Sequence, residues 1–174
     1  GGTGFSLGIE RVERLLQPLL RRLAGVDRTA DTFHAAARRT TGFTTALLFN
    51  PKNAGPDQRV PVREDDLVDH SPVVRRHAGK DLTLRDLCRA TMVTSDNAAA
   101  NLLLRRIGGP PALTAFLRAH GDPVTRSDRM EPEMNRFTPG DPRDTTSPRA
   151  MAASLGRCVL GPVLSPASRG QLAD

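Results

Sequence analysis

The sequence contains no tryptophan and no tyrosine, and aromatic residues make up only 3% of its 174 positions. A hydrophobic core must therefore be aliphatic, built mainly from leucine, valine, alanine and methionine. Single-stranded nucleic acid is disfavoured as a ligand, because few aromatic rings are available to stack against bases. No run of 18 apolar residues occurs, so we expect no membrane-spanning helix.

Only two cysteines occur, Cys88 and Cys158, and they predict neither a disulfide framework nor a metal site. Cys88 falls on a predicted amphipathic helix, where we expect it to be a small buried apolar side chain. His34, His77 and His120 have no metal-ligand spacing with one another or with the cysteines. We therefore predict no metal and no cofactor.

The chain is basic, with 25 lysine and arginine residues against 19 acidic ones and a net charge of +6. Only Lys52 and Lys80 are lysines, a bias that fits a GC-rich genome as well as a selected ligand. An arginine face for nucleic acid or an acidic membrane is the alternative. The arginine pairs are scattered, so we predict neither partner. The first four residues begin no charged-then-apolar leader, so no signal peptide is visible.

The first third of the chain gives weak structural signals. Residues 9–24 carry a helical stripe of apolar side chains, interrupted by Pro18. Residues 31–39 could form a second helix with Asp31 as its N-cap. Residues 40–49 are ambiguous between strand and helix, and residues 50–59 are typical of a loop.

From residue 82 onward the sequence predicts helices over 82–92, 96–107, 110–120 and 148–159, with a short one beginning at Ser165. The helix at 96–107 is apolar on nearly all sides, which is typical of the centre of a bundle. Thr146 or Ser147 should cap the helix at 148–159, with Pro148 in its first turn. Residues 122–147 form a long polar loop, a kind of segment that is usually functional or disordered. The sum is a mainly α helical bundle with at most a little strand.

A turn of three polar residues, Ser95, Asp96 and Asn97, stands just before the central helix. Such a cluster is commonly nothing more than a helix N-cap. The wider segment, Thr-Ser-Asp-Asn-Ala-Ala-Ala-Asn-Leu-Leu-Leu, nevertheless resembles the middle motif of the class A serine β-lactamases. The resemblance implies that Ser95 relays a proton to the leaving lactam nitrogen. It also implies that Asn97 binds the amide of the substrate and that Asp96 turns inward to hold the turn.

The polar loop carries Asp-Arg-Met-Glu-Pro-Glu-Met-Asn, which is similar to the Ω-shaped loop of the same family. A surface turn is the alternative interpretation, in which Glu131 has no chemical role. The resemblance implies that Glu131 is the general base that activates the deacylating water, and that Asn135 helps to hold this water. It further implies that Arg129 and Asp144 tie the ends of the loop. We also expect a cis peptide bond after Glu131.

Three further features bear on the resemblance. His70 stands where the family usually has a tyrosine or tryptophan lining the mouth of the site, although an exposed histidine without a role fits equally well. No Ser-x-x-Lys and no Lys-Thr-Gly occurs in these 174 residues. The segment closest in position to the family's Ser-x-x-Lys is Asp-Thr-Phe-His at 31–34. Its aspartate would stand in place of the nucleophile, or it would simply cap a helix.

The resemblance covers residues 60–174 well, 31–59 poorly and 1–30 not at all. We therefore expect residues 31–174 to form the all-α half of the β-lactamase fold, lacking most of its sheet. Residues 1–30 would be an N-terminal helical segment. An apolar face left open by the missing sheet could be covered by this segment or by self-association.

The functional expectation is a class A β-lactamase-like protein that binds a β-lactam, belongs in a secreted or periplasmic location and is catalytically defective. Losing the nucleophile of a serine hydrolase costs on the order of 10⁶ in kcat. The resemblance implies that one oxyanion-hole donor is missing together with Lys-Thr-Gly, and losing one such donor costs on the order of 10² to 10³ more. Two alternatives are a non-catalytic module that binds a β-lactam or peptidoglycan fragment, and an arginine-rich helical interaction protein.

Overall fold

A computed structural model describes residues 33–34, 55–136, 138–166 and 168–169. The described part is mainly α, as the sequence predicts. Its α-helices are α3 (Leu84–Thr94), α4 (Asn97–Ile107), α5 (Gly109–Ala119) and α6 (Pro148–Val159). The predicted helix at 9–24 and the ambiguous segment at 40–49 lie outside the described residues. The division of the chain into an N-terminal segment at 1–30 and a domain at 31–174 stays a prediction.

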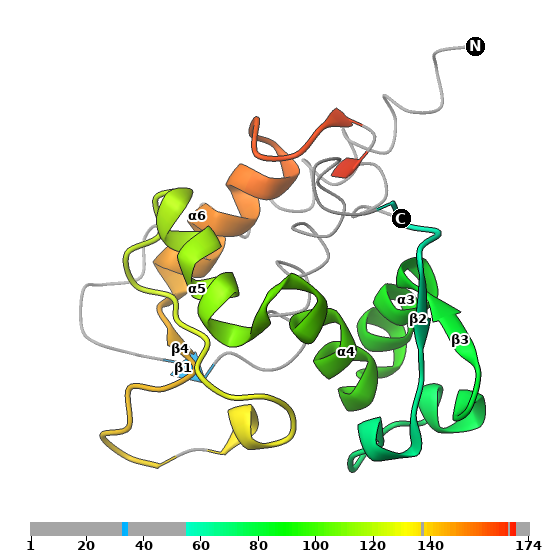
Figure 1. Cartoon of the computed structure of the whole chain (residues 1–174). Helices are drawn as coiled ribbons and strands as arrows, with labels where there is room; N and C mark the ends of the chain where they lie inside the picture. The colour runs from blue at the N-terminus through cyan, green and yellow to red at the C-terminus, as the bar shows by residue number, and fades with distance from the viewer. Residues whose placement is uncertain (1–32, 35–54, 137, 167, 170–174) are drawn as a thin grey trace.

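Helix α4 lies at the centre, with α3 on one side and α5 and α6 on the other (Figure 1). One buried cluster joins α4 to α3 and to the hairpin beside it; its members on α4 include Ala98, Ala99, Leu102 and Leu103. A second cluster joins Leu104 of α4 to α5, α6 and Met134 of the long loop. Two cores on two faces explain why this helix is apolar nearly all round, and both cores are aliphatic, as predicted.

Caps and breakers set the ends of these helices. The Thr83 hydroxyl accepts a hydrogen bond from the Asp86 amide, and the Asp86 carboxylate accepts one from the Thr83 amide, so a capping box opens α3. Gly108 ends α4 at a φ of 100°, a left-handed conformation that suits glycine. Ser147 caps α6, and Pro148 occupies its first turn, as predicted.

Short strands account for the differences from the sequence-based prediction. β2 (Arg59–Pro61) pairs antiparallel with β3 (Asp81–Thr83), so the segment expected to begin a helix at residue 82 is extended as far as its Thr83 cap. β1 (Phe33–His34) pairs with β4 (Thr145–Thr146). The predicted helix at 31–39 is therefore wrong at Phe33–His34, because the backbone there pairs with the β-branched pair Thr145–Thr146 instead of continuing a helical turn.

The described residues of the predicted long loop at 122–147 are irregular except for the 3-10 helix η3 (Glu133–Asn135) and β4. Two further 3-10 helices, η1 (Glu64–Asp66) and η2 (Val74–His77), lie between β2 and β3. Within the described ranges no helix is long and apolar enough to cross a membrane. On α3, Val93 is 73% exposed, and self-association over an apolar face stays a prediction.

Asp96 connects α4 to the segment before it. Its side chain is fully buried, and one carboxylate oxygen accepts the amide of Ala99, which caps α4. The other oxygen accepts the amides of Val73 and Val74 at 2.8 and 3.0 Å, where η2 begins. One buried carboxylate thus satisfies three backbone donors from two elements.

Removing this carboxylate should be costly. We expect Asp96→Ala to lower the free energy of unfolding by at least about 3 kcal/mol, because buried amides lose their acceptor. The matched control is Asp86→Ala, which removes an exposed carboxylate from the capping box of α3 and should cost only about 1 kcal/mol. Urea denaturation of both variants measures the difference, and equal losses would contradict the role of Asp96.

Candidate active site

The turn that joins α3 to α4 presents Ser95. This residue ends α3 in the left-handed conformation, with a φ of 58°, and its amide donates to the carbonyl oxygen of Thr91. Serine adopts this conformation at a cost of about 1–2 kcal/mol, so the surrounding contacts must hold it there. Asp96, directly after it, supplies such contacts from the buried side.

His70 packs against the same turn. Its Nε2 lies 3.0 Å from the carbonyl oxygen of Thr94, and because a carbonyl only accepts, Nε2 carries the proton. The amide of Asn97 donates to the carbonyl of His70, and Nδ2 of Asn97 donates to the carbonyl of Asp69 at 2.9 Å. The structure therefore brings His70, Ser95 and Asn97 together at the start of α4, and their roles at the mouth of a site stay predictions.

Glu131 is attached to α4 one turn further along. The amide of Glu131 donates to Oδ1 of Asn101 at 2.8 Å, and Nδ2 of Asn101 donates back to the Glu131 carbonyl at 2.9 Å. Asn101 is buried, so both bonds are shielded from water. The sequence analysis did not single out Asn101. The available signal is its spacing of four from Asn97, which places both asparagines on one face of α4.

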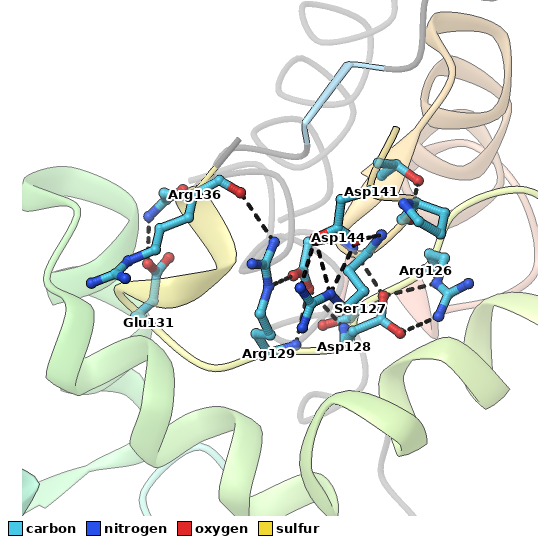
Figure 2. A network of polar contacts seen from close by, with 12 residues as sticks. Arg126, Ser127, Asp128, Arg129, Glu131, Arg136, Asp141 and Asp144 are labelled. Atoms are coloured by element: carbon cyan, nitrogen blue, oxygen red, sulfur yellow. Dashed lines mark hydrogen bonds and ion pairs between the residues drawn. The ribbon is translucent and has the colours of Figure 1, made fainter. Parts of the chain in front are cut away.

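The two sides of the long loop are tied by charged side chains (Figure 2). Nε of Arg129 donates to Asp144 at 2.5 Å, which gives the pair the geometry expected of the clasp. The other oxygen of the buried Asp144 accepts the amides of Asp128 and Arg129. The amide of Asp144 in turn donates to Asp128, and Arg129 also donates to the carbonyl of Arg136. Further pairs, Arg126 with Asp128 and Arg143 with Asp141, stiffen each side.

Glu131 is only 2% exposed. Oε2 accepts a hydrogen bond of 2.5 Å from Nδ2 of Asn135, whereas Oε1 is buried and has no hydrogen-bond partner among the described residues. The peptide bond to Pro132 is cis, as predicted. Met134, which the sequence analysis did not single out, is buried in the core against α5 and α6 and anchors the loop beside the carboxyl group.

Burial raises the pKa of Glu131 from 4.5 to about 7. The hydrogen bond from Asn135 favours the ionised form and works against this rise, while the nearby charges of Asp144 and Glu133 add to it. A carboxyl group with a pKa near neutral exchanges protons readily at physiological pH, which suits a general base. Its unpartnered oxygen is the atom at which a proton could be taken up.

Backbone conformation marks the same residues. In the described ranges, the non-glycine residues with positive φ are His70, Ser95 and Asp144, at 58°, 58° and 55°. All three are site residues expected from the sequence. Strained backbone of this kind persists only where the surroundings hold it, and it clusters at functional sites.

The eight site residues expected from the sequence thus form two groups. His70, Ser95, Asp96 and Asn97 surround the start of α4, and Arg129, Glu131, Asn135 and Asp144 lie in the loop. Asn97 and Asn101 connect the groups through one helix. Among the described residues, no cluster of histidine, cysteine, aspartate or glutamate could hold a metal ion. The described part of Asp-Thr-Phe-His is strand β1, so it does not begin a helix as Ser-x-x-Lys does.

The raised pKa of Glu131 predicts a pH-dependent stability. Between pH 4.5 and about 7 the unfolded chain ionises this group while the folded chain keeps it protonated, so stability falls as pH rises through this window and levels off above it. Glu131→Gln removes this titration. We expect the variant to gain stability relative to the original chain from pH 4.5 to 7, as measured by urea denaturation. Glu64→Gln is the control, because Glu64 is exposed in η1 and does not contribute to the raised pKa of Glu131. A gain that does not change with pH would contradict the raised pKa.

Comparison with known proteins identifies the family of the chain. The model of the β-lactamase enzyme family matches residues 48–174. β-Lactamase L2 of Stenotrophomonas maltophilia is 70% identical over 118 residues, which cover 68% of this chain and 39% of that protein. The solved structure of L2 complexed with relebactam has a TM-score of 0.76 and 58% identity, over 83% of this chain and 54% of that one.

A class A β-lactamase representing the last common ancestor of Gram-negative bacteria has a TM-score of 0.79 and 44% identity. The alignment covers 92% of this chain and 68% of the ancestral one. The chain therefore spans well under half the length of its curated relative L2 and about two thirds of the ancestral structure. With a family match over residues 48–174 and the fold of the all-α half, the chain belongs to the class A serine β-lactamase family.

Proposed function

We propose that these residues are arranged for the reaction of the family, hydrolysis of a β-lactam ring through a serine acyl-enzyme, and that this 174-residue polypeptide is catalytically defective. The observation that carries the first part is the Glu131 carboxyl group. It is buried, has a pKa of about 7, keeps Oε1 without a partner and has Oε2 held by Asn135.

In the proposed deacylation step, Oε1 of Glu131 takes a proton from a water molecule, and the resulting hydroxide attacks the acyl carbonyl carbon. Asn135 stabilises the ionised carboxylate through Oε2 and helps to hold the water. The two hydrogen bonds from Asn101 fix the backbone of Glu131, so the carboxyl group does not need to reorganise before the step.

Ser95 and Asn97 are proposed to handle the substrate. The Ser95 hydroxyl relays a proton to the lactam nitrogen as the ring opens. One N–H of the Asn97 side chain already donates to Asp69, which leaves the second N–H and Oδ1 for the amide of a β-lactam. His70 lines the mouth beside them. A relative solved in complex with relebactam supports the proposal of a small molecule at this site.

The defect is proposed from the sequence. No Ser-x-x-Lys supplies a nucleophile with its activating lysine, and no Lys-Thr-Gly follows in these 174 residues. A secreted or periplasmic location is proposed as well, because the relatives are bacterial β-lactamases.

A second candidate is a non-catalytic module that binds a β-lactam or a peptidoglycan fragment. The observation that favours it is the internal support of the site. Asn97, Glu131 and Asn135 are held by Asp69, Asn101 and one another, without any contribution from a Ser-x-x-Lys helix. The arginine-rich interaction protein stays a prediction from composition alone.

A nitrocefin assay tests the proposed defect. We expect no hydrolysis by the 174-residue polypeptide, because a lost nucleophile alone lowers kcat on the order of 10⁶. Turnover that disappears in Ser95→Ala or Glu131→Gln, but persists in the exposed control Glu133→Gln, would contradict the defect. Saturable calorimetric binding of a penicillin without turnover, weakened by Asn97→Ala, would favour the binding module.

A further inference from the structure

A second carboxylate, Asp122, is buried at the base of the long loop and takes no part in the site described above. It is 2% exposed and accepts four hydrogen bonds. Oδ1 accepts the amides of Val124 and Thr125 at 2.9 and 2.8 Å. Oδ2 accepts the hydroxyls of Thr125 and Ser154, both at 2.6 Å. Ser154 belongs to α6, so the carboxylate joins the start of the loop to that helix.

The end of the loop is joined to the same carboxylate through Thr125. The hydroxyl oxygens of Thr125 and Thr146 lie 2.6 Å apart. Because the single hydroxyl proton of Thr125 goes to Asp122, Thr146 must be the donor in this contact. Thr125, Thr146 and Ser154 are all buried. A directed chain therefore runs from Thr146 through Thr125 to Asp122.

The ionisation state of Asp122 agrees with this direction. Burial on its own would raise the pKa of Asp122, but hydrogen bonds from Ser154 and Thr125 outweigh it and hold the pKa below its usual value. At neutral pH the Asp122 carboxylate is therefore ionised and can only accept hydrogen bonds. Arg118 at the end of α5 completes the arrangement by donating to the carbonyl oxygens of Asp122 and Thr125, each at 2.6 Å.

A continuous series of contacts leads from this base toward Glu131. Directly above the Thr125–Thr146 pair, the amide of Arg126 donates to the carbonyl of Thr145 at 3.0 Å. The next contacts are those of Asp128 with Asp144, two residues further along one side of the loop and one residue along the other. Glu131 follows after Arg129, which lies in the clasp. The Asp122 group and the clasp therefore close the loop at two separate levels.

We propose that Asp122 locks both ends of the 122–147 loop onto α5 and α6 and is thereby a positioning residue for Glu131. The proposal builds on the proposed function, because Glu131 is the residue whose place it sets. Asp122 does not contact the reacting atoms. It acts by keeping the loop closed, and a closed loop shields the Glu131 carboxyl group from bulk solvent while leaving room for the single water of the proposed reaction.

The test is the pKa of Glu131 in Asp122→Ala and Ser154→Ala, read from the carboxyl ¹³C shift and assigned with Glu131→Gln. We expect the pKa to fall from about 7 toward 4.5 in both variants, and further in Asp122→Ala. Amide exchange should speed up at least about tenfold at Thr125, Arg126 and Asp128, since a hydrogen bond to a charged group contributes about 1.5–3 kcal/mol. Exchange within α4 should stay unchanged.

The control is Asp141→Asn, which removes a carboxylate of the same loop whose partner, Arg143, lies on the same side. It should leave the pKa of Glu131 as it is. Should Asp122→Ala fail to fold, Ser154→Ala decides, because it removes one hydrogen bond and leaves the carboxylate in place. An unchanged Glu131 pKa, or equal loss of protection in the loop and in α4, would overturn the proposal. Neither readout depends on a β-lactam, so a failure of the proposed function gives a different result.

Discussion

Two hydrogen bonds between the side chain of Asn101 and the backbone of Glu131 hold the site together. They attach the long loop to the helix that begins directly after Ser95 and Asp96. Because α4 is packed between two aliphatic cores, its position is set by burial on both faces. Both groups of site residues are attached to α4, so its position sets theirs. A central helix is thus the common reference for a turn and a loop that lie far apart in the sequence.

The raised pKa of Glu131 depends on the closure of the loop. Burial away from bulk solvent is its main cause, so any opening of the loop would return the carboxyl group to ordinary acidity. Three levels of contact oppose such opening: the Asp122 group at the base, the Arg129–Asp144 clasp above it and Met134 in the core. The arrangement shows how a polar loop without long secondary structure can hold one carboxyl group in an apolar setting.

The ends of the helices could be predicted from the sequence, because they are set by interactions between residues close together in the chain. Asp96, Gly108 and Ser147 mark helix ends through chemistry that acts within a few residues. The strand pair of Phe33–His34 with Thr145–Thr146 could not be predicted, because two-residue strands have no periodicity and their partners are distant in the chain. The Arg129–Asp144 clasp came from family resemblance, whereas Asn101 and Asp122 needed coordinates, since a single polar residue does not reveal which distant backbone or hydroxyl groups it meets.

Amide hydrogen exchange in Asn101→Leu tests the central role of this helix most directly. The leucine keeps the branched shape of the side chain but leaves the amide and carbonyl of Glu131 without partners. The account predicts that the Glu131 amide and the Met134 amide, which donates to Met130, lose protection, while the Asn97 amide, which donates to His70, keeps it. Unchanged protection at Glu131, or equal loss at Glu131 and Asn97, would contradict the account.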